Sequence, residues 1–206
     1  MQFKTLLIDL DGVLRQWNDS DIPAEMAFGL PANEIAAVAF SPSLLTPAIT
    51  GVITDQEWRA RIAQELERRH EGCLAHVAVA RWSQSPGTVD QSTLSLLQRC
   101  RGDLRLVLVT NATSRLTEDL VALGLTGVFD EVINSSELRV AKPADAFFRL
   151  ALERAGVLAN QALFIDDSVA NVSAASALGI ESHLFANHGA MAAFLRRHGV
   201  LNDPWR

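Results

Sequence analysis

The run FKTLLIDLDGVL at Phe3–Leu14 constrains the fold of this chain more than any other stretch. Its mostly apolar block is the length of one strand and ends at Asp9, Asp11 and Gly12. Apolar residues without polar alternation are typical of a strand buried on both faces, as in a parallel sheet. Open α/β sheets bind ligands beyond the carboxyl ends of their strands. Asp9 and Asp11 are therefore candidates for a catalytic or metal site.

The same residues have a second interpretation. Asp11–Gly12 between two apolar segments is also typical of a hairpin turn. Taken alone, the pattern leaves the choice between a turn and a site open, and the rest of the chain has to decide it.

From Val89 onward the chain alternates strand and helix patterns. Apolar runs predict strands at Leu104–Thr110 and Ala162–Asp166, and we expect further short strands at Phe129–Ile133 and Ser182–Phe185. Helical stripes surround them, and the first contains Val89, Leu96, Leu97 and Cys100. This alternation predicts an α/β fold with a Rossmann-like, mainly parallel sheet and right-handed crossovers.

Residues 15–85 interrupt that alternation and contain no pattern of a buried strand. Thr54 and Glu57 have the spacing of a helix capping box. Trp58, Ile62 and Leu66 recur at every fourth position, as on one face of a helix. We therefore expect an α/β core from residues 1–14 and 86–206, with a helical cap at 15–85 inserted after the first strand.

Composition excludes several classes of function. The 206 residues are 49% hydrophobic and 20% charged, as in ordinary globular proteins. Acidic residues (24) outnumber basic ones (18), and no basic cluster indicates a nucleic-acid partner. The chain shows no signal-peptide pattern and no apolar run of about 20 residues, so we expect a cytoplasmic protein without a membrane partner. The 2 cysteines and 5 histidines lack the spacing of a zinc site.

Further polar residues follow the other predicted strands. They are Thr110 and Asn111, Lys142 before Pro143, and the pair Asp166–Asp167. Each alone is typical of a helix cap or a surface residue. Together, four carboxylates at one sheet edge would repel one another without a cation, and an oxygen-only set suits Mg²⁺. A hydroxyl, a lysine and helix N-termini suit a phosphate, which a carboxylate could attack.

These residues form four motifs in order. They are DLDGVL at Asp9–Leu14, VTNAT at Val109–Thr113, VAKP at Val140–Pro143 and FIDDSVAN at Phe164–Asn171. The set resembles the motifs of the haloacid dehalogenase (HAD) superfamily of aspartate-nucleophile phosphohydrolases. The resemblance covers essentially the whole chain, including an insertion between the first and second motifs. One departure is Arg139, which stands where relatives often have glycine.

The resemblance implies a role for each motif residue. Asp9 would be the nucleophile and Asp11 the acid, then the base. Thr110 and Lys142 would hold the transferring phosphoryl group, with Asn111 close by. Mg²⁺ would be bound by Asp9, the backbone carbonyl of Asp11, and Asp167, with Asp166 supporting it directly or through water; Asn171 would have a minor role.

We therefore expect an Mg²⁺-dependent phosphatase acting on a small phosphorylated metabolite, such as a sugar phosphate, as a monomer or homodimer. Asp11 and the Asp166–Asp167 pair favour phosphoryl transfer over dehalogenation. A phosphomutase resembling β-phosphoglucomutase stays open, as does a non-catalytic binding or regulatory protein. Specificity would come from the insertion, where Arg15 and Trp17 are candidates. Arg15 could meet a second anionic group, although a solvated arginine is the simpler interpretation.

Overall fold

The computed structural model describes residues 2–17, 22–102 and 104–201, so parts of both predicted domain ranges lie outside it. Its main sheet has five parallel strands in the order β5-β4-β1-β6-β7. The strands are β1 (Thr5–Ile8), β4 (Arg105–Thr110), β5 (Glu131–Asn134), β6 (Ala162–Asp166) and β7 (Glu181–Leu184). The predicted α/β fold class is confirmed.

The central strand β1 is buried on both faces. Leu6 and Ile8 point into one hydrophobic cluster, and Leu7 points into another on the opposite face. Alternate side chains of a strand point to opposite faces, so covering both faces requires apolar residues at consecutive positions. This explains why the sequence of β1 lacks polar alternation.

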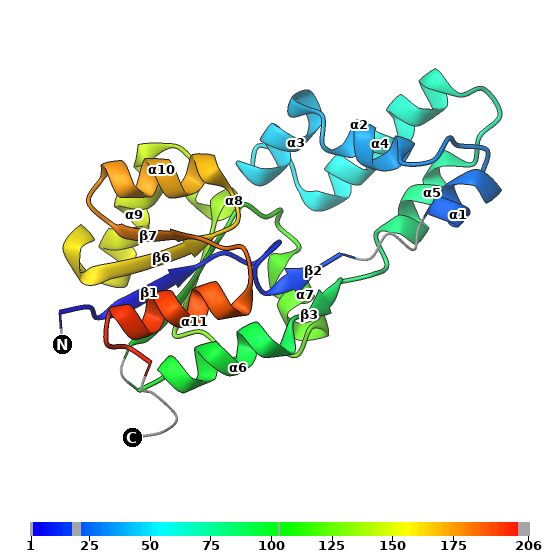
Figure 1. Cartoon of the computed structure of the whole chain (residues 1–206). Helices are drawn as coiled ribbons and strands as arrows, with labels where there is room; N and C mark the ends of the chain where they lie inside the picture. Colours follow the sequence, from blue (N-terminus) through cyan, green and yellow to red (C-terminus); the bar gives the residue numbers. More distant parts are fainter. Residues whose placement is uncertain (1, 18–21, 103, 202–206) are drawn as a thin grey trace.

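Helices cover both faces of the sheet (Figure 1). Helices α6 (Gln91–Cys100), α7 (Leu116–Ala122) and α11 (His188–Arg197) supply the cluster that contains Leu6. Helices α9 (Asp145–Ala155) and α10 (Val169–Ala177) supply the cluster that contains Leu7. The short elements α8 (Ser135–Leu138) and η1 (Ala159–Gln161) lie in the connections before α9 and before β6.

In the described part of the chain, the helices between β2 and β3 form a second group beside the sheet (Figure 1). They are α1 (Ile22–Ala27), α2 (Glu34–Ala39), α3 (Pro42–Ile49), α4 (Asp55–Arg69) and α5 (Ala75–Trp82). Their buried residues form a separate hydrophobic cluster, with Ile62 and Leu66 at 0% exposure. The capping box of Thr54 and Glu57 begins α4, as the spacing predicts. We call this group the helical insertion.

The connections between the two groups differ from the sequence prediction. Val89 does not belong to a helix, because it lies in β3 (Thr88–Val89), which pairs antiparallel with β2 (Arg15–Gln16). Helix α6 begins only after Asp90, whose carboxylate accepts the N–H of Thr93.

The strand predicted at Phe129–Ile133 begins two residues later, at Glu131. Asp130 already contacts β4, because its backbone N–H bonds the carbonyl of Leu106 and its carboxylate accepts the Leu106 N–H. Among the described residues, no helix combines the length and hydropathy that a membrane span requires.

The cluster of the helical insertion can be tested by truncating Ile62. Ile62→Ala removes fully buried methyl groups and should lower the free energy of unfolding by about 2–5 kcal/mol. Val77→Ala is the matched control, because Val77 lies in α5 and is 51% exposed. The control should stay within about 0.5 kcal/mol of wild type in urea unfolding. Equal stability of the two variants would show that this cluster does not stabilise the fold.

Candidate active site

The predicted site residues lie at the carboxyl edge of the sheet. Asp9 follows β1, Thr110 ends β4 and Asp166 ends β6. Because β4 and β6 flank β1, these three residues come from adjacent strands. The chain also reverses direction across the sheet at β1, the position where open α/β sheets form their ligand crevice.

The ammonium group of Lys142 connects these strands. Its Nζ lies 2.8 Å from Asp9 Oδ1, 2.6 Å from Asp166 Oδ2 and 3.0 Å from the carbonyl oxygen of Val109. An ammonium has three donors, and here each has an acceptor. Burial disfavours the charged form, but Asp9 and Asp166 outweigh it, so the pKa of Lys142 is raised. Lys142 is thus a buried cation held between two carboxylates.

Asp166 is fully buried, and both of its carboxylate oxygens accept hydrogen bonds. Besides Lys142, the backbone N–H of Ser168 donates to Oδ1 at 2.8 Å. The amide of Asn171 donates to Oδ1 at 2.9 Å and to Oδ2 at 3.1 Å. With both oxygens occupied, Asp166 is suited to orienting Lys142. The amide of Asn171 therefore holds Asp166 in place.

Asp9, Asp166 and Asp167 bring one carboxylate oxygen each within 4.8 Å of one another. Burial raises the pKa of Asp9 to about 7, Lys142 opposes the shift, and Asp166 adds to it. Burial and Asp166 also raise the pKa of Asp167. Three carboxylates and one ammonium sum to a charge of −2 when ionised. This charge and the oxygen-only donor set fit a divalent cation such as Mg²⁺.

Gly12 allows Asp167 to approach the first strand. Its φ is +75°, and a Cβ placed there would lie 1.9 Å from Asp167 Oδ2. No side chain can therefore replace the glycine without displacing Asp167. The alternative interpretation of Asp11–Gly12 as a hairpin turn is wrong, because β1 pairs in parallel with β4 and β6 and the segment after the turn, β2, pairs with β3.

Thr110 and Asn111 have different surroundings. The Oγ1 atom of Thr110 is buried and has no hydrogen-bond partner among the described residues. An unpaired buried hydroxyl is costly, and a phosphoryl oxygen would satisfy it. Asn111 instead pairs with the backbone of Lys142, donating from Nδ2 to its carbonyl and accepting its N–H, both at 2.9 Å. Its amide fixes the position of Lys142.

Arg15 is buried rather than solvated, so the simpler interpretation of the sequence is wrong. Its Nε and Nη2 contact the two oxygens of Asp11 at 2.7 and 2.8 Å, and its Nη1 contacts Asp119 at 3.0 Å. The indole N–H of Trp17 donates to Asp11 Oδ1 at 2.7 Å. Arg15 also stacks on the Trp17 ring, 4.5 Å from its centroid. Both candidate specificity residues therefore hold the carboxylate of Asp11.

A cavity of about 570 Å³ lies between the sheet edge and the helical insertion. Asp11 and Asn111 line it on the sheet side, and Phe40, Trp58 and Trp82 line it on the insertion side. Its volume is in the usual range for small-molecule sites. Thr113 Oγ1 donates to Asp55 at 2.9 Å across the same boundary, so the second motif touches the first turn of α4. We call this space the interdomain cavity.

The arginines that line the interdomain cavity are all paired. Arg15 binds Asp11 and Asp119, and Arg115 binds Asp119 through its Nε at 2.9 Å. Arg59 binds Asp55, and its Nη1 also donates to Ser83. Among the described lining residues, every cation therefore already has a carboxylate partner.

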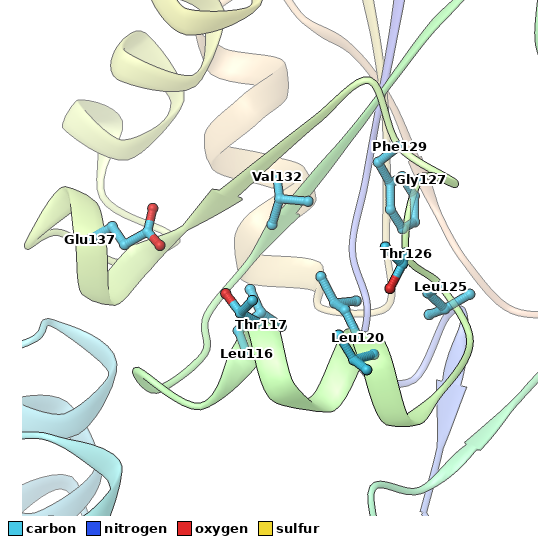
Figure 2. Close-up of a pocket in the computed structure, with 10 residues that line it drawn as sticks. Leu116, Thr117, Leu120, Leu125, Thr126, Gly127, Phe129, Val132 and Glu137 are labelled. Atoms are coloured by element: carbon cyan, nitrogen blue, oxygen red, sulfur yellow. The ribbon is translucent and has the colours of Figure 1, made fainter.

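A smaller cavity of about 230 Å³ lies between α7 and β5 (Figure 2). Figure 2 shows Leu120, Leu125, Phe129 and Val132 around it, with Glu137 at its other end. Glu137 is the one ionisable residue among those that line it. This cavity lacks the groups that acid–base or metal chemistry needs, whereas the candidate acid Asp11 lines the interdomain cavity, which is therefore the candidate substrate space. Its described lining does not include Asp9, Thr110, Lys142, Asp166 or Asp167.

The family model described as haloacid dehalogenase-like hydrolase matches residues 3–179. The chain therefore belongs to the haloacid dehalogenase-like hydrolases, as the order of its motifs predicts.

Curated relatives match the chain over part of their length. The ribulose-1,5-bisphosphate 5-phosphatase of Halopiger xanaduensis is 35% identical over 46% of this chain and 40% of its own. The glyceraldehyde 3-phosphate phosphatase of Methanocaldococcus jannaschii is 36% identical over 32% of this chain and 29% of its own. A drimenol cyclase of Aspergillus calidoustus is 26% identical over 88% of this chain and 34% of its own. The chain thus spans less than half the length of these relatives.

Solved structures share the fold. A HAD family enzyme of Bacteroides thetaiotaomicron in a magnesium complex has a TM-score of 0.76 at 24% identity, covering 96% of this chain and all of its own. Its complex with magnesium and inorganic phosphate has a TM-score of 0.74 at 24% identity, covering 89% and 94%. At this identity the likeness establishes the fold alone.

The raised pKa of Asp9 predicts a pH dependence of stability without metal. The pKa of Asp9 is about 7 in the folded protein, whereas an aspartate in the unfolded chain has a pKa of about 4. The stability due to this proton is present at low pH and is lost as the pH rises from about 4 to 7. Asp9→Asn should therefore lose less stability than wild type over this range.

Urea unfolding in a chelator at several pH values measures this difference. Asp145→Asn is the matched control, because Asp145 is exposed in the first turn of α9. The control should follow the wild-type dependence. A wild-type dependence in Asp9→Asn would show that Asp9 does not titrate in this range.

Proposed function

We propose that this protein is a Mg²⁺-dependent phosphohydrolase that removes phosphate from a small phosphorylated metabolite through an aspartyl-phosphate. The observation that carries the proposal is the buried Lys142 ammonium between Asp9 and Asp166, beside the unpaired hydroxyl of Thr110. A nucleophile, a cation and a free donor at one sheet edge are the groups that phosphoryl transfer needs. Membership of the hydrolase family supports the same reaction class.

Asp9 would act as the nucleophile. The N–H of Leu10 and the ammonium of Lys142 both contact its Oδ1, each at 2.8 Å. These contacts fix the carboxylate and leave Oδ2 without either donor. An Asp9 oxygen would form a bond to phosphorus while the ester oxygen leaves, and Lys142 and Thr110 would stabilise the charge on the phosphoryl oxygens.

Asp11 would transfer the protons. It would protonate the departing oxygen and then take a proton from the water that attacks the aspartyl-phosphate, which releases phosphate and restores Asp9. Arg15 and Trp17 orient its carboxylate in the structure. Loss of the acid–base group costs typically about 10²–10⁴ in rate.

Mg²⁺ would be held by Asp9, Asp167 and the backbone carbonyl of Asp11, with Asp166 in support. When bound, it would offset the charge of this cluster and polarise the phosphoryl group. The carboxylate of Asp11 is outside the group formed by Asp9, Asp166 and Asp167, consistent with a role in proton transfer. Gly12 keeps the space that Asp167 needs.

We propose further that residues 15–85 act as a cap over the core of 1–14 and 86–206. The insertion forms its own hydrophobic cluster and supplies one wall of the interdomain cavity. Such a cap would exclude water and contact the part of the substrate remote from phosphorus. A phosphomutase would have to hold a second phosphate in this space, and the lining carboxylates, which outnumber the lining arginines, disfavour it.

The direct test is release of inorganic phosphate from p-nitrophenyl phosphate with and without Mg²⁺. Wild type should be active only with the metal, and Asp9→Asn should lose turnover while keeping its fold by circular dichroism. Asp145→Asn, an exposed Asp-to-Asn change, should stay at the wild-type rate. Full activity in Asp9→Asn, or none in wild type, would contradict the proposal.

The metal site can be tested separately from turnover with two glycine variants. Gly12 and Gly124 have φ of +75° and +69°, but an added Cβ meets Asp167 only at Gly12 and nothing within 4 Å at Gly124. Both Ala variants should lose about 1 kcal/mol or more from backbone strain.

Only Gly12→Ala should also lose the rise in melting temperature caused by Mg²⁺. For a ligand at 100 times its dissociation constant, this stabilisation is about 2.7 kcal/mol. An equal Mg²⁺ shift in both variants would contradict the metal site at Asp167.

A further inference from the structure

The interdomain cavity is lined by arginines that are paired with carboxylates and by large apolar side chains. Its arginines are Arg15, Arg59 and Arg115, and each already contacts a carboxylate at 3.0 Å or less. The lining also contains the carboxylates Asp11, Glu25, Asp55 and Asp119, which outnumber the arginines. The cavity therefore has no excess positive charge to attract a second anionic group on a substrate. The described lining is therefore poorly suited to a bisphosphate or a sugar acid phosphate.

The wall formed by the helical insertion is aromatic. Phe40 packs edge-on against Trp82, with centroids 6.2 Å apart, and Trp82 packs against Trp58 at 5.9 Å. The indole N–H of Trp58 is used by the carbonyl of Ala39. Phe40 has no side-chain donor and that of Trp58 is occupied, so these two rings present apolar surface.

Two large apolar side chains of the cavity remain open to solvent. Phe40 is 57% exposed and Trp17 is 51% exposed, and both line the cavity. Trp17 lies beside Asp11 through its indole N–H, so apolar surface begins next to the candidate acid. Covering such surface by an apolar group is favourable at about 25 cal/mol per Å².

We propose that the substrate is a phosphate monoester of an uncharged, largely apolar alcohol, whose carbon skeleton covers Phe40, Trp82 and Trp17. This inference rests on the proposed phosphatase function and narrows its substrate class. A bond forms between an Asp9 oxygen and phosphorus as the phosphorus–oxygen ester bond breaks, the alcohol oxygen takes the proton of Asp11, and the apolar alcohol leaves through the interdomain cavity. Sugar phosphates, with several hydroxyls to satisfy, fit this wall less well.

The test compares esters of primary alcohols, so that leaving-group acidity is similar. The substrates are 2-phenylethyl phosphate, glycerol 3-phosphate and glucose 6-phosphate, all with Mg²⁺. We expect kcat/KM for 2-phenylethyl phosphate to exceed the other two by about tenfold or more, the usual range for apolar pocket contacts. A higher kcat/KM for glycerol 3-phosphate or glucose 6-phosphate would overturn the inference while leaving the phosphatase function intact.

Substitution of Phe40 tests whether the aromatic wall causes the preference for 2-phenylethyl phosphate. Phe40→Ala should lower kcat/KM for 2-phenylethyl phosphate by about tenfold and leave glycerol 3-phosphate within about twofold. Phe40→Leu should recover part of the loss, because it restores apolar surface. Val77→Ala, an exposed apolar change outside the cavity, is the matched control and should match wild type. Equal losses on both esters in Phe40→Ala would overturn the role of this wall.

A binding measurement separates this inference from the reaction itself. Calorimetry with Mg²⁺ compares 3-phenylpropylphosphonate, which has no cleavable ester, with methylphosphonate. We expect the first to bind about tenfold more tightly or better in wild type and to lose that advantage in Phe40→Ala. Equal affinities of the two phosphonates would overturn the inference, even if no ester were hydrolysed. If no ester were hydrolysed but the phosphonates bound as expected, only the phosphatase proposal would be overturned.

Discussion

The ammonium of Lys142 is the interaction on which the candidate site depends. Its three acceptors come from three adjacent strands: Val109 from β4, Asp9 after β1 and Asp166 from β6. The loop that carries it is fixed in turn by Asn111, which pairs with both backbone groups of Lys142. One buried cation thus sets the position of the proposed nucleophile relative to the sheet edge.

The same cation does not balance the carboxylates around it. Asp166 is saturated by Lys142, Ser168 and Asn171, so the charge of Asp9 is left without a full partner. This explains why burial raises the pKa of Asp9 to about 7 even though Lys142 lies 2.8 Å away. A site that is short of positive charge in this way fits a divalent cation, which would offset the negative charge.

The sequence predicts the core of this arrangement because the core depends on local patterns. Unalternated apolar runs identify the buried strands, and polar residues at their ends identify Asp9, Thr110 and Asp166. Arg139, which stands where relatives often have glycine, has a φ of 58°. That departure from the motif therefore marks a real backbone constraint, a left-handed residue at the end of α8.

Other features of the candidate site depend on contacts in the folded chain, which no local sequence pattern predicts. The carbonyl of Val109 is a backbone group, which every residue possesses, so its use by Lys142 has no signature in the sequence. Arg15 contacts Asp119, a residue 104 positions away, and this contact is part of what buries it. Asn171 donates to Asp166 only because the first turn of α10 returns its amide to the end of β6.

Arg15 and Trp17, the candidate specificity residues, both contact the candidate acid Asp11, and their positions in the sequence do not predict these contacts. Both side chains line the interdomain cavity, and both hold the carboxylate of Asp11. A leaving group that packs against Trp17 therefore touches a residue that orients the candidate acid. Substituting either residue would change substrate fit and proton transfer together, so neither can separate the two. Phe40 packs against Trp82, and the described side chains that donate to Asp11 are Arg15 and Trp17, so Phe40 can report on fit alone. In the proposed reaction, recognition of the alcohol and transfer of its proton would thus share one hydrogen-bonded group, while the remote part of the cavity would act only through the surface it covers.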